Sequence, residues 1–377
     1  MQLKRPGISR RNLVKAATIV PFSAIAGSAA NSAVKVGLIG SGNRGPSLAG
    51  FAHKDSRASI VAISDLFDEQ IEQGKKRIGT ENPAIYKDYH DLLHSDVDAV
   101  IIATPHHLHA EHFEAAGKAK KHIYLEKPVA NDVEGCRRIM RAADSADRDI
   151  NITAGFQRRY AHVYKKAKTL FDSGEIGKIR MARADFIKGE APEKEKVYPR
   201  PATEMEKVQR WKYWNETSGG QTVGNEVHSV DVLNWFLGGH PLKAIGSGGR
   251  TARTRGDITD HAYVIYDYPK DVQAVLTGSV LAPRFYRDVK EQFFTPTDIV
   301  ETSQEYWKHY RGQGHVLAED SPRSTTEDSI IAFINRIVEG KPENTGVQGA
   351  ESTLTAFLGY RAVELRREVT WDEMMKG

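Results

Sequence analysis

Residues 34–45, VKVGLIGSGNRG, decide the fold of the first half of the chain. The apolar residues are typical of a buried β-strand, and the strand runs directly into a G-x-G-x-x-G pattern. Gly40 allows a tight turn, Gly42 lets the backbone approach a pyrophosphate, and Gly45 lets the next helix pack on the sheet. The free N–H groups at the start of that helix favour phosphate. The pattern therefore predicts a dinucleotide site formed by Gly40, Gly42, Asn43, Arg44 and Gly45.

A second apolar strand, residues 59–64, ends on Asp65. An acidic side chain at this place, about twenty residues after the glycines, can accept hydrogen bonds from both ribose hydroxyls of an adenosine. Its charge repels a 2′-phosphate, so the sequence predicts NAD rather than NADP. A glycine turn in an α/β protein without a cofactor is the alternative, which the order of strand, glycines and acid disfavours.

Strands and helices alternate from here to residue 154. Further strands are expected over 98–103, 122–125 and 151–154, and helices over 69–78, 109–119 and 132–146, the last of them capped by Asp132. This alternation is typical of a doubly wound parallel sheet. We therefore predict a Rossmann domain over residues 34–154.

The pattern changes in the second domain, residues 155–377. A helix over 161–173 leads to β-rich segments at 179–187, 243–247, 261–268 and 272–279, and helices over 326–339 and 351–366 close the chain. Residues 189–210 are polar and are expected to be a long loop. The segments suit a mostly antiparallel open sheet. The predicted fold is thus α/β, with an α+β second domain for substrate binding and oligomerisation.

Residues 1–33 are similar to an export signal. Arg10 and Arg11 stand in SRRNLVK, residues 9–15, which resembles a twin-arginine motif, and small residues then offer cleavage after Ala26 or Ala30. The apolar run between them is too short for a stable membrane span. A basic leader or an uncleaved anchor is the alternative. The motif predicts a periplasmic protein, since this route carries folded proteins.

The composition of the chain is that of a globular enzyme. It has 377 residues, of which 40% are hydrophobic and 27% are charged, and a net charge of +4. The basic residues of the leader account for this charge, so no nucleic-acid surface is expected. Cys136 is the single cysteine, which excludes an intrachain disulfide. No metal is expected, because the histidines at 106, 107, 109 and 112 lack the partners of a zinc pattern.

Four motifs follow one another along the chain: the glycine pattern, ATP at 103–105 with His109, EKP at 126–128 and HSVD at 228–231. A closing run, VTWDEMM at 369–375, completes the series. In order and spacing they resemble the Gfo/Idh/MocA oxidoreductases, named after glucose-fructose oxidoreductase and inositol dehydrogenase. The resemblance covers the whole chain after the leader. It implies cofactor contacts for Thr104, Pro105, His109, Glu126 and Lys127.

Lys127 and His228 are the candidate catalytic residues. A lysine at a strand end can stabilise a developing alkoxide, and the resemblance implies this role for Lys127. His228 lies in a helix expected over 227–237, where its imidazole can accept the hydroxyl proton while a hydride leaves for NAD. The inositol dehydrogenase pattern has an aspartate four residues before this histidine. This chain has Gly224 there, a departure from the simple Lys-Asp-His mechanism.

Candidate substrate contacts are Arg159, Trp211, Asn225 and Asp231. Arg159 opens the second domain and could bind an anionic group. Trp211 belongs to the aromatic stretch 210–214, which suits either the wall of a sugar pocket or a core cluster. Asp231 shares a helical face with His228 and could orient the imidazole or tie the helix to the sheet.

These features predict an NAD-dependent oxidoreductase that acts on a carbohydrate. An exported enzyme has no exchangeable NAD pool, so the cofactor should be held tightly and regenerated in place. A redox-assisted glycosidase, which oxidises a glycoside transiently and releases its aglycone, meets the same requirement. The third possibility is an NAD-bound sensor without turnover. A homo-oligomer is expected, formed through the exposed face of the open sheet.

Overall fold

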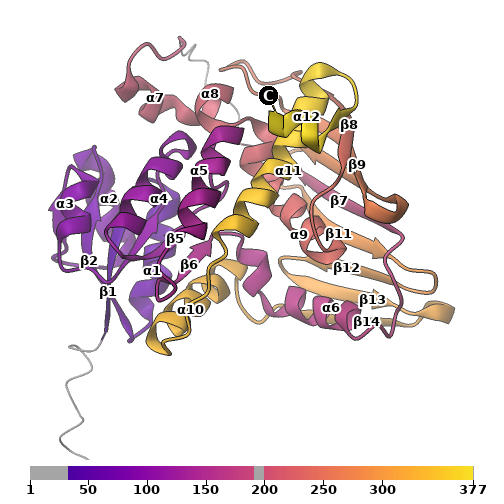
Figure 1. Ribbon diagram of the computed structural model, residues 1–377, viewed down its shortest axis with the longest axis horizontal. Helices are drawn as coiled ribbons and strands as arrows, with labels where there is room; N and C mark the ends of the chain where they lie inside the picture. Colours follow the sequence, from indigo (N-terminus) through magenta and orange to yellow (C-terminus); the bar gives the residue numbers. More distant parts are fainter. Residues whose placement is uncertain (1–32, 191–198, 377) are drawn as a thin grey trace, which may run out of the picture. The chain divides into compact units, whose positions relative to one another are not determined.

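The computed structural model describes residues 33–190 and 199–376. Apart from Ala33, the expected export signal lies outside the described residues, and its targeting role stays a prediction. From Val34 onward the chain forms one compact unit that contains two β-sheets (Figure 1). The predicted boundary at residue 154 follows the last strand of the first sheet.

Six parallel strands form the first sheet, in the order β3-β2-β1-β4-β5-β6. Their bounds are β1 Val34–Ile39, β2 Ala58–Ser64, β3 Ala84–Tyr86, β4 Ala99–Ile102, β5 His122–Leu125 and β6 Ile152–Ala154. The strand order reverses between β1 and β4. Such a reversal opens a crevice at the carboxyl ends of the strands, where ligands of these sheets bind. The predicted doubly wound sheet is confirmed.

Helices cover both faces of this sheet (Figure 1). They are α1 Arg44–Lys54, α2 Asp68–Ile78, α3 Tyr89–His94, α4 His109–Lys118, α5 Val133–Asp144 and, from the far end of the chain, α10 Thr325–Val338. α1, α2 and α10 share one apolar cluster with the sheet, whereas α3, α4 and α5 belong to another. Asp132 caps α5 as predicted, because its Oδ1 accepts a hydrogen bond from the Gly135 amide over 2.6 Å.

Nine strands form the second sheet, in the order β14-β13-β12-β11-β7-β10-β9-β8-β15. Their bounds are β7 Met181–Lys188, β8 Lys243–Gly249, β9 His261–Tyr268, β10 Val272–Ser279, β11 Arg287–Phe294, β12 Ile299–Ser303, β13 Tyr306–Tyr310, β14 Val316–Asp320 and β15 Val369–Thr370. Only the pair of β7 and β10 is parallel among these described strands. The predicted mostly antiparallel sheet is confirmed.

Several elements differ from the expectations. β3 and β11 to β14 were not predicted, because polar residues such as Lys290 and Gln292 alternate with the buried ones and dilute the apolar signal. The expected loop over 189–210 ends in helix α7, Glu204–Arg210, which begins at a capping box of Thr203 and Glu206. Residues 191–198 of that loop lie outside the described residues.

Three long helices cover one face of the second sheet: α6 His162–Asp172, α9 Val227–Leu237 and α11 Gly346–Leu365. α11 lies between the two sheets and is buried on almost every side (Figure 1). Short elements complete the chain: α8 Asn215–Ser218, α12 Trp371–Lys376, the 3₁₀ turns η4 His106–Leu108, η5 Gln157–Tyr160, η6 Trp211–Tyr213, η8 Pro269–Asp271 and η9 Gly312–Gly314, and one π-helical turn, η7 Thr222–Glu226.

A buried ion pair fixes the start of α9 on the second sheet. The Arg158 guanidinium binds the Glu291 carboxylate of β11, and both side chains are almost fully buried. The Ser229 hydroxyl accepts from Arg158 over 3.1 Å and donates to Glu291 over 2.8 Å. Tyr164 and Thr302 donate to the other carboxylate oxygen. This network sits beside His228 in the sequence, so it fixes where the histidine is presented.

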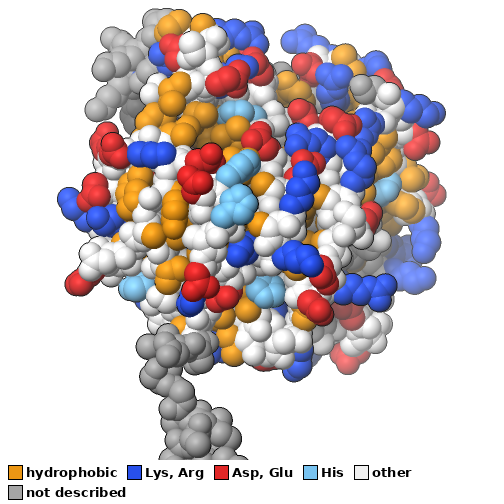
Figure 2. All heavy atoms as spheres, turned by 60° about the vertical axis from the view of Figure 1, so that its left-hand side comes forward, with side chains coloured by type: hydrophobic (Ala, Val, Ile, Leu, Met, Phe, Trp, Pro, Cys, Tyr) orange, Lys and Arg blue, Asp and Glu red, His pale blue; other side chains and the backbone are white. Residues whose placement is uncertain are grey.

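The outer surface carries charges of both signs. Figure 2 shows basic and acidic side chains interspersed with apolar ones over the face that it turns forward. No described helix has the length and apolar character needed to cross a bilayer.

Candidate functional site

Two adjoining cavities lie at the carboxyl ends of β1, β4 and β5. The nucleotide cavity, about 900 Å³, is lined by Gly40, Gly42, Asp65 and Pro105 among others. The reaction cavity, about 860 Å³, is lined by Glu126, Lys127 and His228 among others. Asn43, Arg44, Thr104 and Trp211 line both cavities. Several of the predicted cofactor residues thus lie where the two cavities meet.

The glycines of the first motif fit a bound dinucleotide. Gly40 has φ +93°, and a Cβ there would lie 2.8 Å from the Ala103 backbone. A Cβ at Gly45 would lie 2.0 Å from the Gly40 carbonyl oxygen, so only glycine lets α1 pack this closely. At Gly42 a Cβ would meet no described atom within 4 Å, and the residue borders the nucleotide cavity. That open space is what a pyrophosphate beside the backbone requires.

Asp65 stands at the other side of the nucleotide cavity. Its Oδ2 accepts from the Ser41 amide over 2.7 Å, and its Oδ1 accepts from the Phe67 amide over 3.0 Å. Each carboxylate oxygen keeps a further lone pair that can accept from a ribose hydroxyl. The two amides therefore hold the carboxylate in place without saturating it.

Asp65 leads to a prediction about cofactor choice. NAD should bind at least about tenfold more tightly than NADP, because a carboxylate next to a 2′-phosphate costs several kcal/mol. Asp65→Ala should narrow this ratio, whereas the exposed Asp144→Ala on α5 should leave it unchanged. Fluorescence titration with both nucleotides measures the ratio. Equal or tighter binding of NADP to the unaltered protein contradicts the prediction.

Arg44 joins the glycine motif to the EKP motif. Its Nε donates to Glu126 Oε1 over 2.6 Å, and its Nη2 donates to Gln157 Oε1 over 2.5 Å. Glu126 Oε2 also accepts from the Lys127 amide over 2.9 Å. Glu126 is buried, so this ion pair fixes the turn after β5 from which Lys127 extends.

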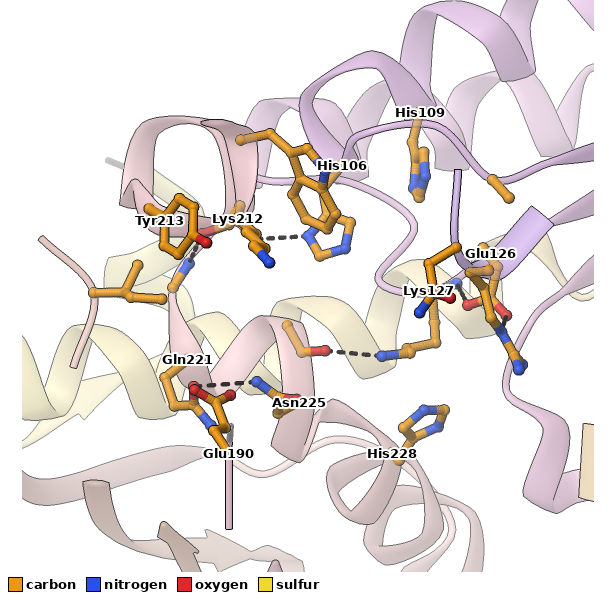
Figure 3. Close-up of a pocket in the computed structure, with 18 of the residues that line it drawn as sticks. His106, His109, Glu126, Lys127, Glu190, Lys212, Tyr213, Gln221, Asn225 and His228 are labelled. Atoms are coloured by element: carbon orange, nitrogen blue, oxygen red, sulfur yellow. Dashed lines mark hydrogen bonds and ion pairs between the residues drawn. The ribbon is translucent and has the colours of Figure 1, made fainter. Parts of the chain in front are cut away.

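Lys127 extends from that turn into the reaction cavity, where its Nζ donates to the Gly224 carbonyl over 2.8 Å (Figure 3). Burial lowers the pKa of Lys127 to about 8, and the nearby charges of Arg44 and Lys188 act in the same direction. Glu126 opposes them. The lysine is therefore poised to change its charge near neutral pH.

His228 faces the same cavity from α9, across from Lys127 (Figure 3). Burial, together with the charge of Lys127, holds the pKa of His228 well below its usual value. Its Nδ1 is buried and has no hydrogen-bond partner among the described residues. The ring itself borders the cavity, and a neutral imidazole there can accept a proton from a bound hydroxyl group through a nitrogen that reaches the cavity.

His109 and Thr104 brace the loop between the cavities. His109 is buried, with Nδ1 at 2.7 Å from the Pro128 carbonyl and Nε2 at 2.8 Å from the Thr104 carbonyl. The ring thus connects the loop after β4 to the turn after β5. The Thr104 hydroxyl lies 3.0 Å from His112 Nδ1. Among the described residues, no group of three or more histidine, cysteine or acidic side chains could hold a metal ion.

Two family models match the chain. One, described as an oxidoreductase family with an NAD-binding Rossmann fold, covers residues 34–153, and the other, a GFO/IDH/MocA C-terminal domain, covers residues 164–295. This chain belongs to the Gfo/Idh/MocA oxidoreductases. It is an NAD(P)-dependent oxidoreductase of this type, and its first domain is an NAD-binding Rossmann fold.

Relatives and solved structures agree with this assignment. The myo-inositol 2-dehydrogenase of Thermotoga maritima is 25% identical over 360 residues, which are 91% of this chain and 100% of that protein. The structure of scyllo-inositol dehydrogenase from Lactobacillus casei with NAD(H) and scyllo-inositol has a TM-score of 0.69 at 23% identity, covering 90% of this chain and 99% of that one. A levoglucosan dehydrogenase in complex with NADH and L-sorbose has a TM-score of 0.77 at 18% identity, with the same coverage.

In this Gfo/Idh/MocA protein, Gly224 stands where the inositol dehydrogenase pattern has an aspartate, and it lies in an unusual local structure. Gly224 lies inside the π-helical turn η7, directly before α9, and its carbonyl oxygen holds the Lys127 ammonium. Such turns are frequent at functional sites. At this place in the sequence the chain thus offers Lys127 a backbone carbonyl, which carries no negative charge.

The predicted substrate residues divide into two pairs. Trp211 and Asn225 line the reaction cavity, and the Trp211 ring packs on His106 at 4.3 Å between ring centroids. Arg159 and Asp231 need correction: they bind each other through two nitrogens, at 2.8 and 2.9 Å, and do not line the cavity. Asp231 also accepts from Ser352 of α11 over 2.7 Å. Its side chain ties α9 to α11, so it does not face the substrate.

Sequence reasoning missed several cavity residues. Lys188 ends β7, and its place directly after an expected strand was the available signal. Arg253 and Arg255 lie in the loop between β8 and β9, which no local pattern singles out. The buried Asp260 organises that loop by accepting from the amides of residues 251–253. Burial opposes the charge of Asp260, but these hydrogen bonds prevail and lower its pKa to about 2.

Proposed function

We propose that this protein oxidises a hydroxyl group of a carbohydrate by hydride transfer to NAD. One observation carries the proposal: Lys127 and His228 face a single cavity that adjoins the nucleotide cavity, one from the turn after β5 and one from α9 (Figure 3). Their chemistry is complementary, because one donates a hydrogen bond and the other accepts a proton. The dehydrogenase names of the relatives, which include inositol and levoglucosan enzymes, support a polyhydroxylated substrate.

Each residue of the reaction cavity has its own role in the proposed oxidation. The Lys127 ammonium binds the hydroxyl oxygen and stabilises the negative charge that develops there. His228 accepts the hydroxyl proton on its neutral imidazole, and the carbonyl group forms as the hydride leaves the same carbon. NAD held by the glycine motif and Asp65 would supply the hydride acceptor. Trp211 offers an aromatic face on which the sugar ring can stack, and Asn225 offers polar atoms to its hydroxyls.

A screen with two readouts tests the proposal against its alternatives. Free sugars and aryl glycosides are added to the purified protein, and NADH absorbance and aglycone release are recorded together. Absorbance gain with free sugars supports the dehydrogenase. Aglycone release without net NADH supports the redox-assisted glycosidase. Sugar binding without either signal supports a sensor.

We also propose export through the twin-arginine route, with the cofactor retained inside the protein. The support is the sequence of residues 9–15. We expect Arg10→Lys combined with Arg11→Lys to leave the protein in the cytoplasm, whereas Arg5→Lys, outside the motif, should not affect export. Cell fractionation measures the distribution. Periplasmic recovery of the double variant would refute the targeting and remove the need for internal regeneration of NAD.

A homo-oligomer is proposed from the outer face of the second sheet. Ile245, Ile265 and Val275 are exposed neighbours across β8, β9 and β10, and Tyr263 extends the patch. An apolar patch of this kind is typical of an interface. Ile265→Glu is expected to lower the mass measured by light scattering to that of the monomer. Ile85→Glu, an exposed isoleucine of β3, is the control. A monomeric unaltered protein contradicts the proposal.

A further inference from the structure

The lining of the reaction cavity is strongly basic. Among the described residues, six basic and two acidic side chains border it. The basic ones are Arg44, Lys127, Lys188, Lys212, Arg253 and Arg255, and the acidic ones are Glu126 and Glu190. The outer face in Figure 2, by contrast, mixes both signs. An enclosed excess of one charge raises the local concentration of ligands of the opposite charge.

Both acidic residues of the lining are held in ion pairs with basic residues of the same cavity. Glu126 binds Arg44 over 2.6 Å, and Glu190 binds Arg253 over 2.8 Å. A third carboxyl group lies close by, on the fully buried Glu226. Burial raises the pKa of Glu226 to about 7, so near neutral pH this group is only partly ionised and offsets only part of the positive charge.

Lys188 is the basic residue best placed for a substrate. Its Nζ donates to Asn225 Oδ1 over 2.8 Å, on the π-helical turn that also holds Lys127. Its charge lowers the pKa of both Lys127 and His228, after the larger effect of their burial. Asn225 follows Gly224, whose carbonyl oxygen holds Lys127, so an anionic group bound at Lys188 would lie beside the turn that holds the catalytic lysine.

The nucleotide does not account for this charge. The glycine motif borders the nucleotide cavity, whereas Lys188, Arg253 and Arg255 line only the reaction cavity. The nicotinamide ring of oxidised NAD is itself cationic, so its arrival adds positive charge to this space. Lys188 donates to a neutral amide and forms no ion pair with a described residue, so a neutral sugar would leave its charge without compensation.

We propose that the substrate is an anionic carbohydrate, one that carries a carboxylate or phosphate group, and that Lys188, which donates to a neutral amide, binds this group. This inference rests on the proposed function and names its substrate class. Ammonium and guanidinium groups form charge-assisted hydrogen bonds with both kinds of anion. A comparison of carboxylate and phosphate substrates distinguishes the two kinds of anion.

Matched substrates test the inference. For the gluco, galacto and manno series, four compounds are compared: the methyl hexoside, its 6-carboxylate, the uncharged 6-carboxamide and the 6-phosphate. NADH formation gives kcat/KM, and calorimetry with NAD-loaded protein gives Kd. The best anionic compound should exceed its neutral partners by about 10- to 100-fold in kcat/KM and in affinity, the usual effect of hydrogen bonds to charged groups.

Variants of Lys188 assign the preference to this site. Lys188→Met should reduce the ratio of kcat/KM for the anionic substrate to kcat/KM for the neutral one about tenfold or more. Lys188→Arg should retain most of this ratio because the charge remains. Lys178→Met, at an exposed lysine before β7, should leave the ratio unchanged. Thermal melting of each variant shows that the fold is intact, and Lys188→Gln serves if the methionine variant does not fold.

The outcomes separate this inference from the proposed function. If hexosides and carboxamides are oxidised as well as the anionic compounds, the inference is wrong and the dehydrogenase stands. A ratio that survives Lys188→Met also overturns the assignment to this residue. If anionic compounds bind preferentially but none is oxidised or cleaved, the cavity selects anions and the proposed function fails. Absence of both binding and turnover refutes both.

Discussion

Lys127→Met or His228→Ala is expected to lower kcat/KM by about 10²–10⁴, the usual contribution of a positioned acid–base group. NAD affinity should stay nearly unchanged, because we expect the phosphates and the adenosine to bind at the glycine motif and Asp65, which line the adjoining cavity. Substrate oxidation and NAD binding should therefore be measured on the same samples, the first by NADH absorbance and the second by fluorescence titration.

Matched surface substitutions control for non-specific effects. His315→Ala, at an exposed histidine before β14, and Lys178→Met remove the same kinds of side chain far from both cavities in the sequence. Both should keep the rate of the unaltered protein. If the Lys127 and His228 variants also keep it, the two residues are structural, and the sensor without turnover becomes the better interpretation.

The fold could be predicted to a large extent because the Rossmann half is encoded locally. The apolar run before Gly40 and the acid at Asp65 each report their structural role within a few residues. Strands that depend on long-range packing were harder to predict. β11 pairs with β7 across about a hundred residues, and alternating polar side chains hide it, so its partners determine its conformation.

The residues of the candidate site also differ in how well the local sequence could place them. Residues placed by strand ends of the first sheet, such as Thr104 and Lys127, line the cavities, and their roles there stay predictions. Arg159 and Asp231 were misplaced because helical periodicity gives a face but does not identify the neighbour of that face. Here the neighbour is α11, and Ser352 completes the pair. The basic side chains of Lys188 and Arg253 needed the tertiary structure, since the end of β7 and the loop between β8 and β9 contribute them.

Gly224→Asp is expected to move the alkaline limb of the pH profile upward by about one to three pH units. Lys127 acts as an ammonium group in the proposed mechanism and its pKa is about 8, so kcat/KM of the unaltered protein should fall as the pH rises through about 8. His228 is already neutral at neutral pH, because its pKa lies well below its usual value, and it adds no limb in this range. A carboxylate next to Lys127 favours the charged lysine and extends activity to higher pH.

The structure has room for this change, since among the described atoms the nearest to a Cβ at Gly224 is His106 Cε1, at 3.7 Å. Gly224→Asn is the matched control, because it has the same shape without the charge and should leave the limb near pH 8. The profile of kcat/KM is recorded for all three proteins from pH 6 to 10. A limb that does not move in the aspartate variant means that another group titrates there. An equal shift in both variants means that side-chain volume rather than charge acts on the lysine.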